Sequence, residues 1–218
     1  SGTWTLTGSG TTIWTTSTVT NLSFSRGNDV VLNYSGSTGT RTVTAGLTGG
    51  SEAYAVGFKV TAGSDIFTVS SSNSQRIYNL IFDGFTGTFS AGSRNIYGDF
   101  IITSNSANMT VTAGSNTTTF AATSGTKTIT TSGKTLDFPI TFDGVGGTWQ
   151  LGDDLTIGST RIFALSNGTF NANGKNVSVG FMSSSNSNVR GLNMGSGQWT
   201  ITGSNGSVWN TGSTNYLT

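Results

Sequence analysis

Residues 81–89 read IFDGFTGTF and residues 141–149 read TFDGVGGTW, so the chain repeats itself. Shorter repeats accompany this pattern, since Ala-Gly-Ser occurs at 62–64, 91–93 and 113–115. Intervals of about 20 to 30 residues are typical of a chain that adds one similar coil after another. The sequence therefore predicts a β-solenoid, that is, a parallel β-helix, with coils of roughly 20 residues.

The segments around these repeats alternate in the manner of short β-strands. Residues 40–44 read TRTVT and residues 126–130 read TKTIT. β-Branched Thr, Val and Ile favour strands, and residues that favour helices are sparse. Pairs such as Asp83-Gly84 and Asn173-Gly174 mark turns. An all-β chain with strands of about four to six residues is expected. Tandem antiparallel β-sandwiches remain the alternative fold, because the short repeats are irregularly spaced.

The two ends of the chain also match each other. Residues 1–9 read SGTWTLTGS and residues 196–204 read SGQWTITGS, and the two stretches align without gaps. The match continues through a second pair of tryptophans, and biased composition alone does not align two tryptophan pairs. We therefore interpret residues 1–218 as a single continuous β-repeat segment, in which 1–195 form one long repeat and 196–218 begin the next.

The composition excludes most catalytic and metal-binding chemistry. The 218 residues include 31 Ser, 40 Thr, 32 Gly and 19 Asn, but no His and no Cys. Without His and Cys there is no Ser-His-Asp triad, no thiol nucleophile and no zinc site of the usual kind. Ten basic and nine acidic residues are scattered along the chain, so a nucleic-acid groove is not expected. No apolar run approaches the length of a membrane span, so none is expected.

The acidic residues form no recognisable catalytic or metal site. Asp153-Asp154 is the only acidic pair, and we interpret it as a solvated turn, since a Ca²⁺ site needs several further oxygen ligands. The other acids, such as Asp29, Glu52 and the turn residue Asp83, show no pairing of the kind a glycosidase needs. We assign no catalytic, cofactor-binding or metal-binding residue, and we expect a protein that is not an enzyme.

Five tryptophans, at positions 4, 14, 149, 199 and 209, are candidates for sugar binding, because an exposed indole face can stack on a sugar ring. However, Trp4 shares a strand face with Leu6, and Trp199 shares one with Ile201. Alternation of this kind favours burial of the tryptophans in the core.

The threonines support a weaker hypothesis, ice binding by a flat ladder of hydroxyls. Thr-x-Thr pairs start near positions 3, 40, 110, 126 and 200, which is too irregular for one ladder. Outward threonine on a strand is the ordinary explanation. Asn-x-Ser/Thr sequons are about as frequent as chance predicts and so do not indicate glycosylation. They begin at Asn21, Asn33, Asn108, Asn116, Asn167, Asn176 and Asn205.

Two stretches resemble known families. Residues 121–144, AATSGTKTITTSGKTLDFPITFDG, resemble repeat units in very long Ser/Thr/Gly-rich proteins of aquatic phages and bacteria. Residues 168–180, GTFNANGKNVSVG, resemble a turn of autotransporter-type or pectate-lyase-type β-helices. The resemblance implies a β-solenoid in a surface or virion fibre, adhesin or filament. It implies no catalytic residue, since this sequence has no cluster of Asp with Arg or Lys like that of pectate-lyase-like enzymes.

From these observations we expect a structural or adhesive protein, a segment of an extracellular, cell-surface or virion-surface fibre built from stacked β-repeats. Its expected partner is an identical repeat or subunit joined head to tail, because open strand edges attract further strands. One alternative is a carbohydrate-binding module of a phage fibre or adhesin, with surface glycans as ligands. The weaker alternative is an ice-binding solenoid.

Overall fold

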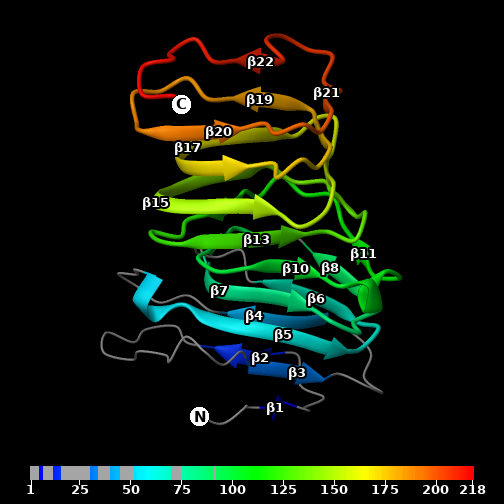
Figure 1. The fold of residues 1–218 in the computed structure, drawn as a ribbon. Coiled ribbons are helices and arrows are strands. Elements are labelled where there is room, and N and C mark those ends of the chain that lie inside the picture. Colours follow the sequence, from blue (N-terminus) through cyan, green and yellow to red (C-terminus); the bar gives the residue numbers. More distant parts are fainter. Residues whose placement is uncertain are drawn as a thin grey trace.

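The chain winds into a stack of coils, with β1 (Thr5–Leu6) at one end and β22 (Trp209–Asn210) at the other (Figure 1). This computed structural model describes residues 5–6, 12–15, 30–33, 40–44, 52–69, 75–90 and 92–218. Every strand pairing within these residues is parallel. The predicted β-solenoid is thereby confirmed, and the antiparallel sandwich alternative is wrong for the described part of the chain.

A 13-stranded sheet supplies two of the three faces of the coils. The first face contains the starts of β5 (Val56–Ala62), β7 (Gln75–Phe82), β15 (Ile140–Leu151) and β17 (Ile162–Asn171), with β9 (Arg94–Ile96), β12 (Thr118–Phe120), β19 (Phe181–Ser183) and β22. The second face contains the ends of those long strands, with β1, β3 (Val30–Asn33), β10 (Phe100–Ile102), β13 (Thr126–Thr130) and β20 (Arg190–Asn193). The long strands turn the corner between these two faces, where their register shifts.

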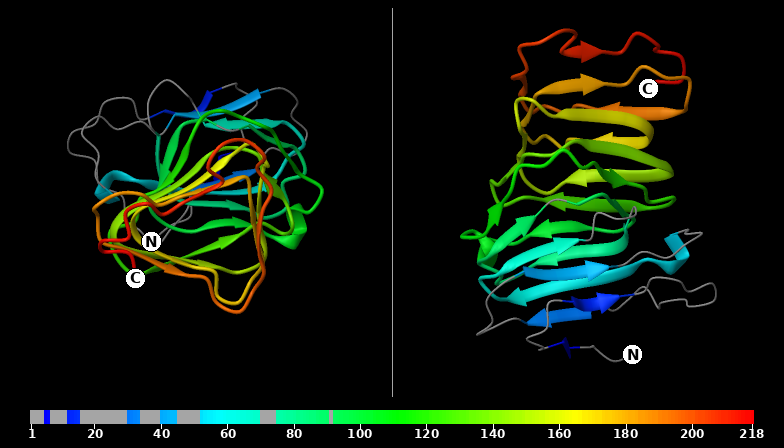
Figure 2. Two further views of the ribbon diagram at one scale, coloured as in Figure 1. Left: turned by 90° about the horizontal axis from the view of Figure 1, so that it is seen from above. Right: turned by 180° about the vertical axis from the view of Figure 1, so that it is seen from behind.

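The third face consists of two separate sheets. The first contains β2 (Thr12–Thr15), β4 (Thr40–Thr44), β6 (Ile66–Val69), β8 (Thr88–Ser90) and β11 (Thr110–Val111). The second contains β14 (Thr135–Leu136), β16 (Leu155–Ile157), β18 (Val177–Val179) and β21 (Trp199–Ile201). No pairing joins β11 to β14 in the described chain, and we call this interruption the seam. The coils beyond the seam are displaced sideways from those before it (Figure 2).

Register partners reveal the length of a coil, because each residue pairs with its counterpart one coil later. Phe120 pairs with Phe142, and Ile77 pairs with Ile96. Both intervals agree with the predicted coil of roughly 20 residues. Two short 3₁₀ turns, η1 (Glu52–Tyr54) and η2 (Ser104–Ser106), lie at corners of the coils.

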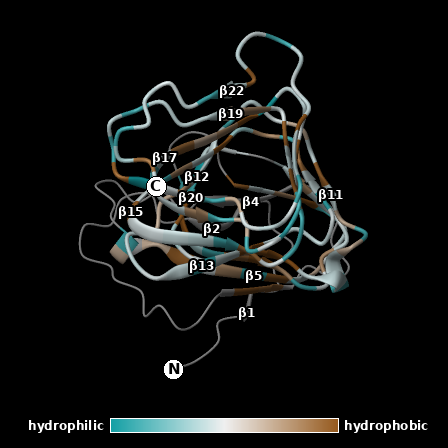
Figure 3. Ribbon diagram, turned by 45° about the horizontal axis from the view of Figure 1, so that its top comes forward, coloured by the Kyte–Doolittle hydropathy of each residue, from teal (hydrophilic) through white to brown (hydrophobic). Residues whose placement is uncertain are grey.

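Apolar side chains from successive coils stack into one continuous core. The rings of Phe120 and Phe142 stack with their centroids 5.1 Å apart, and Phe142 lies 5.0 Å from Phe163 and 4.9 Å from Phe170. Alternation produces this arrangement, because every second residue of strands such as β12 and β18 is buried. Hydrophobic residues are concentrated on the strands, whereas the corners near the C-terminus are mostly hydrophilic (Figure 3).

The repeated pattern at 81–89 and 141–149 forms a corner of the coil in both copies. A Cβ at Gly87 would lie 2.1 Å from the carbonyl oxygen of Asp65, and one at Gly147 would lie 2.1 Å from that of Ala122. Glycine is therefore needed where one coil crosses close over the coil before it. The first copy joins the second face to the third, and the second copy joins the first face to the second. The interval between the copies is consequently not a whole number of coils.

The matching ends of the chain also lie on different faces. β1 belongs to the second face, whereas β21 belongs to the third. Trp4 lies outside the described residues. Whether residues 196–218 begin a further long repeat stays a prediction.

Candidate functional site

The acidic pair Asp153-Asp154 joins neighbouring coils. Asp153 accepts hydrogen bonds from the backbone N–H groups of Thr131 and Ser132, at 2.8 and 2.6 Å. Asp154 accepts from the backbone N–H and the side-chain amide of Asn176, at 2.8 and 3.0 Å, and these bonds lower the pKa of Asp154. Both carboxylates thus form hydrogen bonds to neighbouring coils of the stack. No group of acidic side chains in the described chain is arranged to hold a metal ion.

Asp83 lies at the corner formed by the first copy of the repeated pattern. Its Oδ2 is 2.7 Å from Nζ of Lys59 in the preceding coil. Its Oδ1 accepts hydrogen bonds from Asn105 Nδ2 at 2.8 Å and Thr103 Oγ1 at 2.9 Å in the following coil. Lys59, then Asn105 and Thr103, lower the pKa of Asp83 to about 2. This carboxylate therefore links three successive coils.

Glu52 also contacts a residue that lies far from it in the sequence, Thr123. From η1 its Oε2 accepts hydrogen bonds from the backbone N–H of Thr123 at 3.1 Å and from the hydroxyl of the same residue. Asp29 lies outside the described residues. The acids considered in the sequence therefore serve coil-to-coil contacts wherever the structure describes them.

The tryptophans predicted to be buried differ in their surroundings. Trp149 of β15 is fully buried, which confirms core packing for this residue and removes it as a sugar-stacking platform. Trp199 of β21 is partly buried, with its ring 6.0 Å from the rings of Phe163 and Phe170. The side chain of Trp14 lies outside the described part of the structure.

The core ends at the last coil in an aromatic pair. Trp209 is 37% exposed, and its ring lies 6.2 Å from that of Trp199. Strands β21 and β22 each pair with one other strand in the described chain, so each has one open edge. This coil therefore presents both unpaired strand edges and exposed aromatic surface at one end of the stack.

Arg190 holds the loops of the last two coils together. Its side chain is 1% exposed, and its Nε donates to the hydroxyl of Ser184 at 2.7 Å. Nη1 donates to the carbonyl oxygens of Asn188 and Asn215, and Nη2 to those of Ser184 and Ser213. The guanidinium thus supplies hydrogen-bond donors to backbone carbonyls that turn inward at this corner. It thereby links the last coil to the coil before it.

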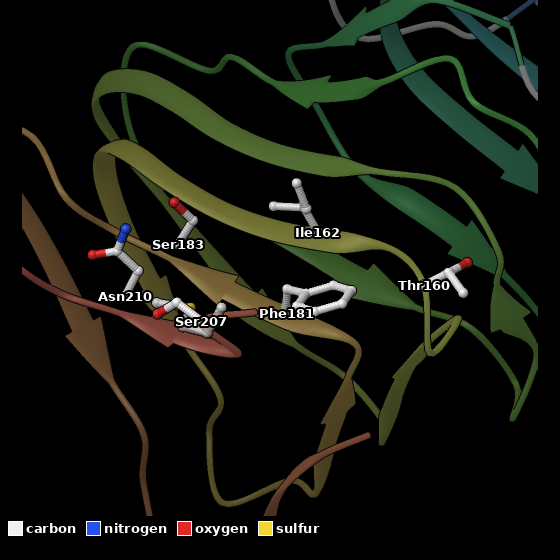
Figure 4. A pocket seen from close by; sticks show the side chains of 7 residues that line it. Thr160, Ile162, Phe181, Ser183, Ser207 and Asn210 are labelled. Carbon is white, nitrogen blue, oxygen red and sulfur yellow. The ribbon is translucent and has the colours of Figure 1, made fainter. Parts of the chain in front are cut away.

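A shallow groove, open to solvent, crosses the first face near the C-terminal end (Figure 4). Register partners Ile162 and Phe181 supply its apolar part, and Ile162 is 46% exposed. Ser183 and Ser207 contribute hydroxyls and Asn210 an amide. No charged side chain lines the groove, which therefore offers apolar surface and uncharged hydrogen-bonding groups.

Sequence reasoning did not identify this groove. Phe181 directly follows Gly180, where the chain passes from the third face to the first, and the alternation of β18 therefore does not extend to it. Only the stacking register brings Phe181 beside Ile162 and Asn210 beside Ser183.

Hydroxyl side chains form short rows that the sequence spacing did not reveal. Thr135, Thr156, Ser178 and Thr200 are successive register partners on the third face. This row belongs to one sheet, which begins only after the seam. Ice binding stays a prediction.

The comparisons with known proteins identify no relatives. No family model, no curated protein and no solved structure matches the chain. Among the described residues, no helix has the length and hydropathy required to cross a lipid bilayer.

Proposed function

We propose that this chain is a non-enzymatic structural segment of an extracellular or virion-surface fibre, in which identical repeats or subunits stack end to end. The observation that carries the proposal is the last coil, with the open edges of β21 and β22 and the exposed ring of Trp209. Open edges accept further strands, and a head-to-tail contact that does not close into a ring produces a fibre.

The matching ends favour an identical partner. Residues 1–9 repeat the pattern of 196–204, so the first residues of a second copy carry nearly the same side chains as the last coil. Stacking of like residues is how this core is already built, as the register pair Phe120 and Phe142 shows. The match supports a partner of like side chains, and it does not fix the register, because β1 belongs to the second face and β21 to the third.

Electron microscopy and sedimentation of the purified chain test this proposal. Rods of several stacked copies, lengthening with protein concentration, are expected. Trp209→Asp places a carboxylate on the exposed end and should give short particles, whereas Val145→Asp places one on a corner far from the end and should leave the rods unchanged. Val145 is a matched control because it is an exposed apolar residue, at 69%. Single, concentration-independent monomers of the unaltered chain would refute the proposal.

A second candidate function, carbohydrate binding, is favoured by the groove at Phe181. Its partly exposed ring, the neighbouring Ile162 and the flanking hydroxyls offer the mixture of apolar and hydrogen-bonding surface that a sugar ring requires. Titration against a panel of neutral glycans should show saturable binding that Phe181→Ala abolishes. Val189→Ala should preserve it, because Val189 is exposed but does not line the groove. Binding that survives Phe181→Ala would place any glycan site elsewhere.

A further inference from the structure

The strongest unexplained feature of the described chain is a buried arginine. Arg94 begins β9 on the first face, in register with Gln75 of β7 and Thr118 of β12. Its side chain is 1% exposed, and both register neighbours are buried polar residues within a largely apolar core. The position lies beside the seam, where the third face is interrupted between β11 and β14.

Two aromatic rings contact the guanidinium of Arg94. Its Cζ lies 4.5 Å from the centre of the Phe89 ring and 4.9 Å from the centre of the Phe138 ring. Phe89 comes from the same coil, whereas Phe138 follows β14 beyond the seam. The rings attract the cation through their quadrupoles. They do not replace the oxygen acceptors that the N–H groups of a guanidinium require for hydrogen bonds.

The N–H groups of this guanidinium have no acceptor in the described chain. Nε, Nη1 and Nη2 of Arg94 are all buried without a hydrogen-bond partner. The hydroxyl of Thr118, its register neighbour, is also buried without a partner. Arg190, the other fully buried arginine in the described chain, instead donates five hydrogen bonds. The contrast identifies Arg94 as a donor cluster that the chain's own acceptors do not satisfy.

The charge on Arg94 persists at neutral pH. Burial lowers the pKa of Arg94 to about 9, so the group is still protonated at pH 7. A buried charge without a partner is strongly destabilising, and a buried group without a hydrogen bond calls for a water or an ion as its partner. No carboxylate of the described residues forms an ion pair with this guanidinium.

We propose that Arg94 and Thr118 hold a small monovalent anion of the size of chloride inside the solenoid, next to the seam. The two rings lie against the guanidinium, so the anion approaches its N–H edge, where the hydroxyl of Thr118 supplies a further donor. A single positive charge matches a monovalent anion. The anion neutralises Arg94 and thereby stabilises the coils on both sides of the seam.

Crystals grown in sodium bromide test the site directly, because bromide replaces chloride and gives an anomalous signal. A peak within hydrogen-bonding distance of the Arg94 guanidinium is expected. The absence of any bromide there, in a crystal that shows Arg94 buried, would overturn the proposal.

Halide-dependent stability gives a second and independent readout in solution. Unfolding is measured in sodium chloride and in sodium gluconate at the same ionic strength, since gluconate is too large for the core. Each tenfold rise in chloride above its Kd should raise the folding equilibrium constant about tenfold. Equal stability in the two salts would contradict the proposal.

Two matched variants separate the site from general salt effects. Arg94→Met removes the donors and should abolish the difference between chloride and gluconate. Arg161→Met removes a partly exposed guanidinium that pairs with Asp137 at 2.7 Å and should leave that difference intact. If Arg94→Met does not fold, the bromide position and the halide dependence of the unaltered chain still decide the matter.

Discussion

Substitution of Gly147 by alanine should destabilise the solenoid through a single steric contact. A Cβ at this position would lie 2.1 Å from the carbonyl oxygen of Ala122, whereas real Cβ contacts essentially never fall below 3.0 Å. The coils must therefore move apart by about 1 Å at this corner, and the Thr148 N–H to Gly125 O hydrogen bond, now 2.9 Å, would be lost.

The expected change in free energy of unfolding is the sum of two destabilising effects and one that offsets them. Overpacking costs about 1–3 kcal/mol, and the lost hydrogen bond about 1 kcal/mol. The lower entropy of the unfolded alanine chain offsets about 0.4–1 kcal/mol. The net loss of about 2 kcal/mol in free energy of unfolding corresponds to a fall in Tm of roughly 4–8 °C, measurable by circular dichroism or calorimetry.

A matched glycine provides the control for this prediction. At Gly212 a Cβ would lie 3.3 Å from Asn210 Oδ1 and 3.4 Å from Ser185 Oγ, which are side-chain ends that can move. Gly212→Ala should leave Tm almost unchanged, whereas Gly87→Ala, at the equivalent position of the first copy, should behave like Gly147→Ala. A Gly147→Ala protein as stable as the unaltered chain would show that close crossing of coils is not what the repeated glycine provides.

Three further outcomes are expected. Arg190→Met removes five hydrogen bonds and leaves inward carbonyls unsatisfied. Amides of 196–218 should then exchange faster with deuterium while those of 140–171 keep their protection, and uniform protection would contradict the role given to Arg190. Phe142→Ala should lower the free energy of unfolding by about 3–5 kcal/mol in denaturant titration, because Phe142 packs against rings of neighbouring coils; a loss below about 1 kcal/mol would count against a single continuous core. The pKa of Asp83 is lowered from 3.8 to about 2. Its contribution to the free energy of unfolding, about 1–2 kcal/mol, is therefore present above pH 4 and is lost as the pH falls towards 2. Lys59→Met should weaken this pH dependence in denaturant titration.

The candidate site shows where reasoning from sequence stops. Burial of Trp149 was predictable, because it alternates with polar neighbours in a strand. The groove was not, because Phe181 and Asn210 belong to different coils and line one groove only through the register of β19 with β22. Likewise, nothing in the local sequence of Arg94 distinguishes it from Arg190, yet one lacks acceptors and the other donates five hydrogen bonds.

The sequence by itself determined the class of fold. Alternation, turn residues and short repeats depend on local chain geometry, and they predicted stacked parallel coils with a narrow core. Only the tertiary structure decided how the coils meet: that the repeated glycine pattern serves two different corners, that the third face breaks between β11 and β14, and that Arg94 lies at this break. The physical reason is that the coils differ in length, as the unequal intervals of the register pairs Ile77–Ile96 and Ile96–Phe120 show. Each difference in length changes which side chains come into register.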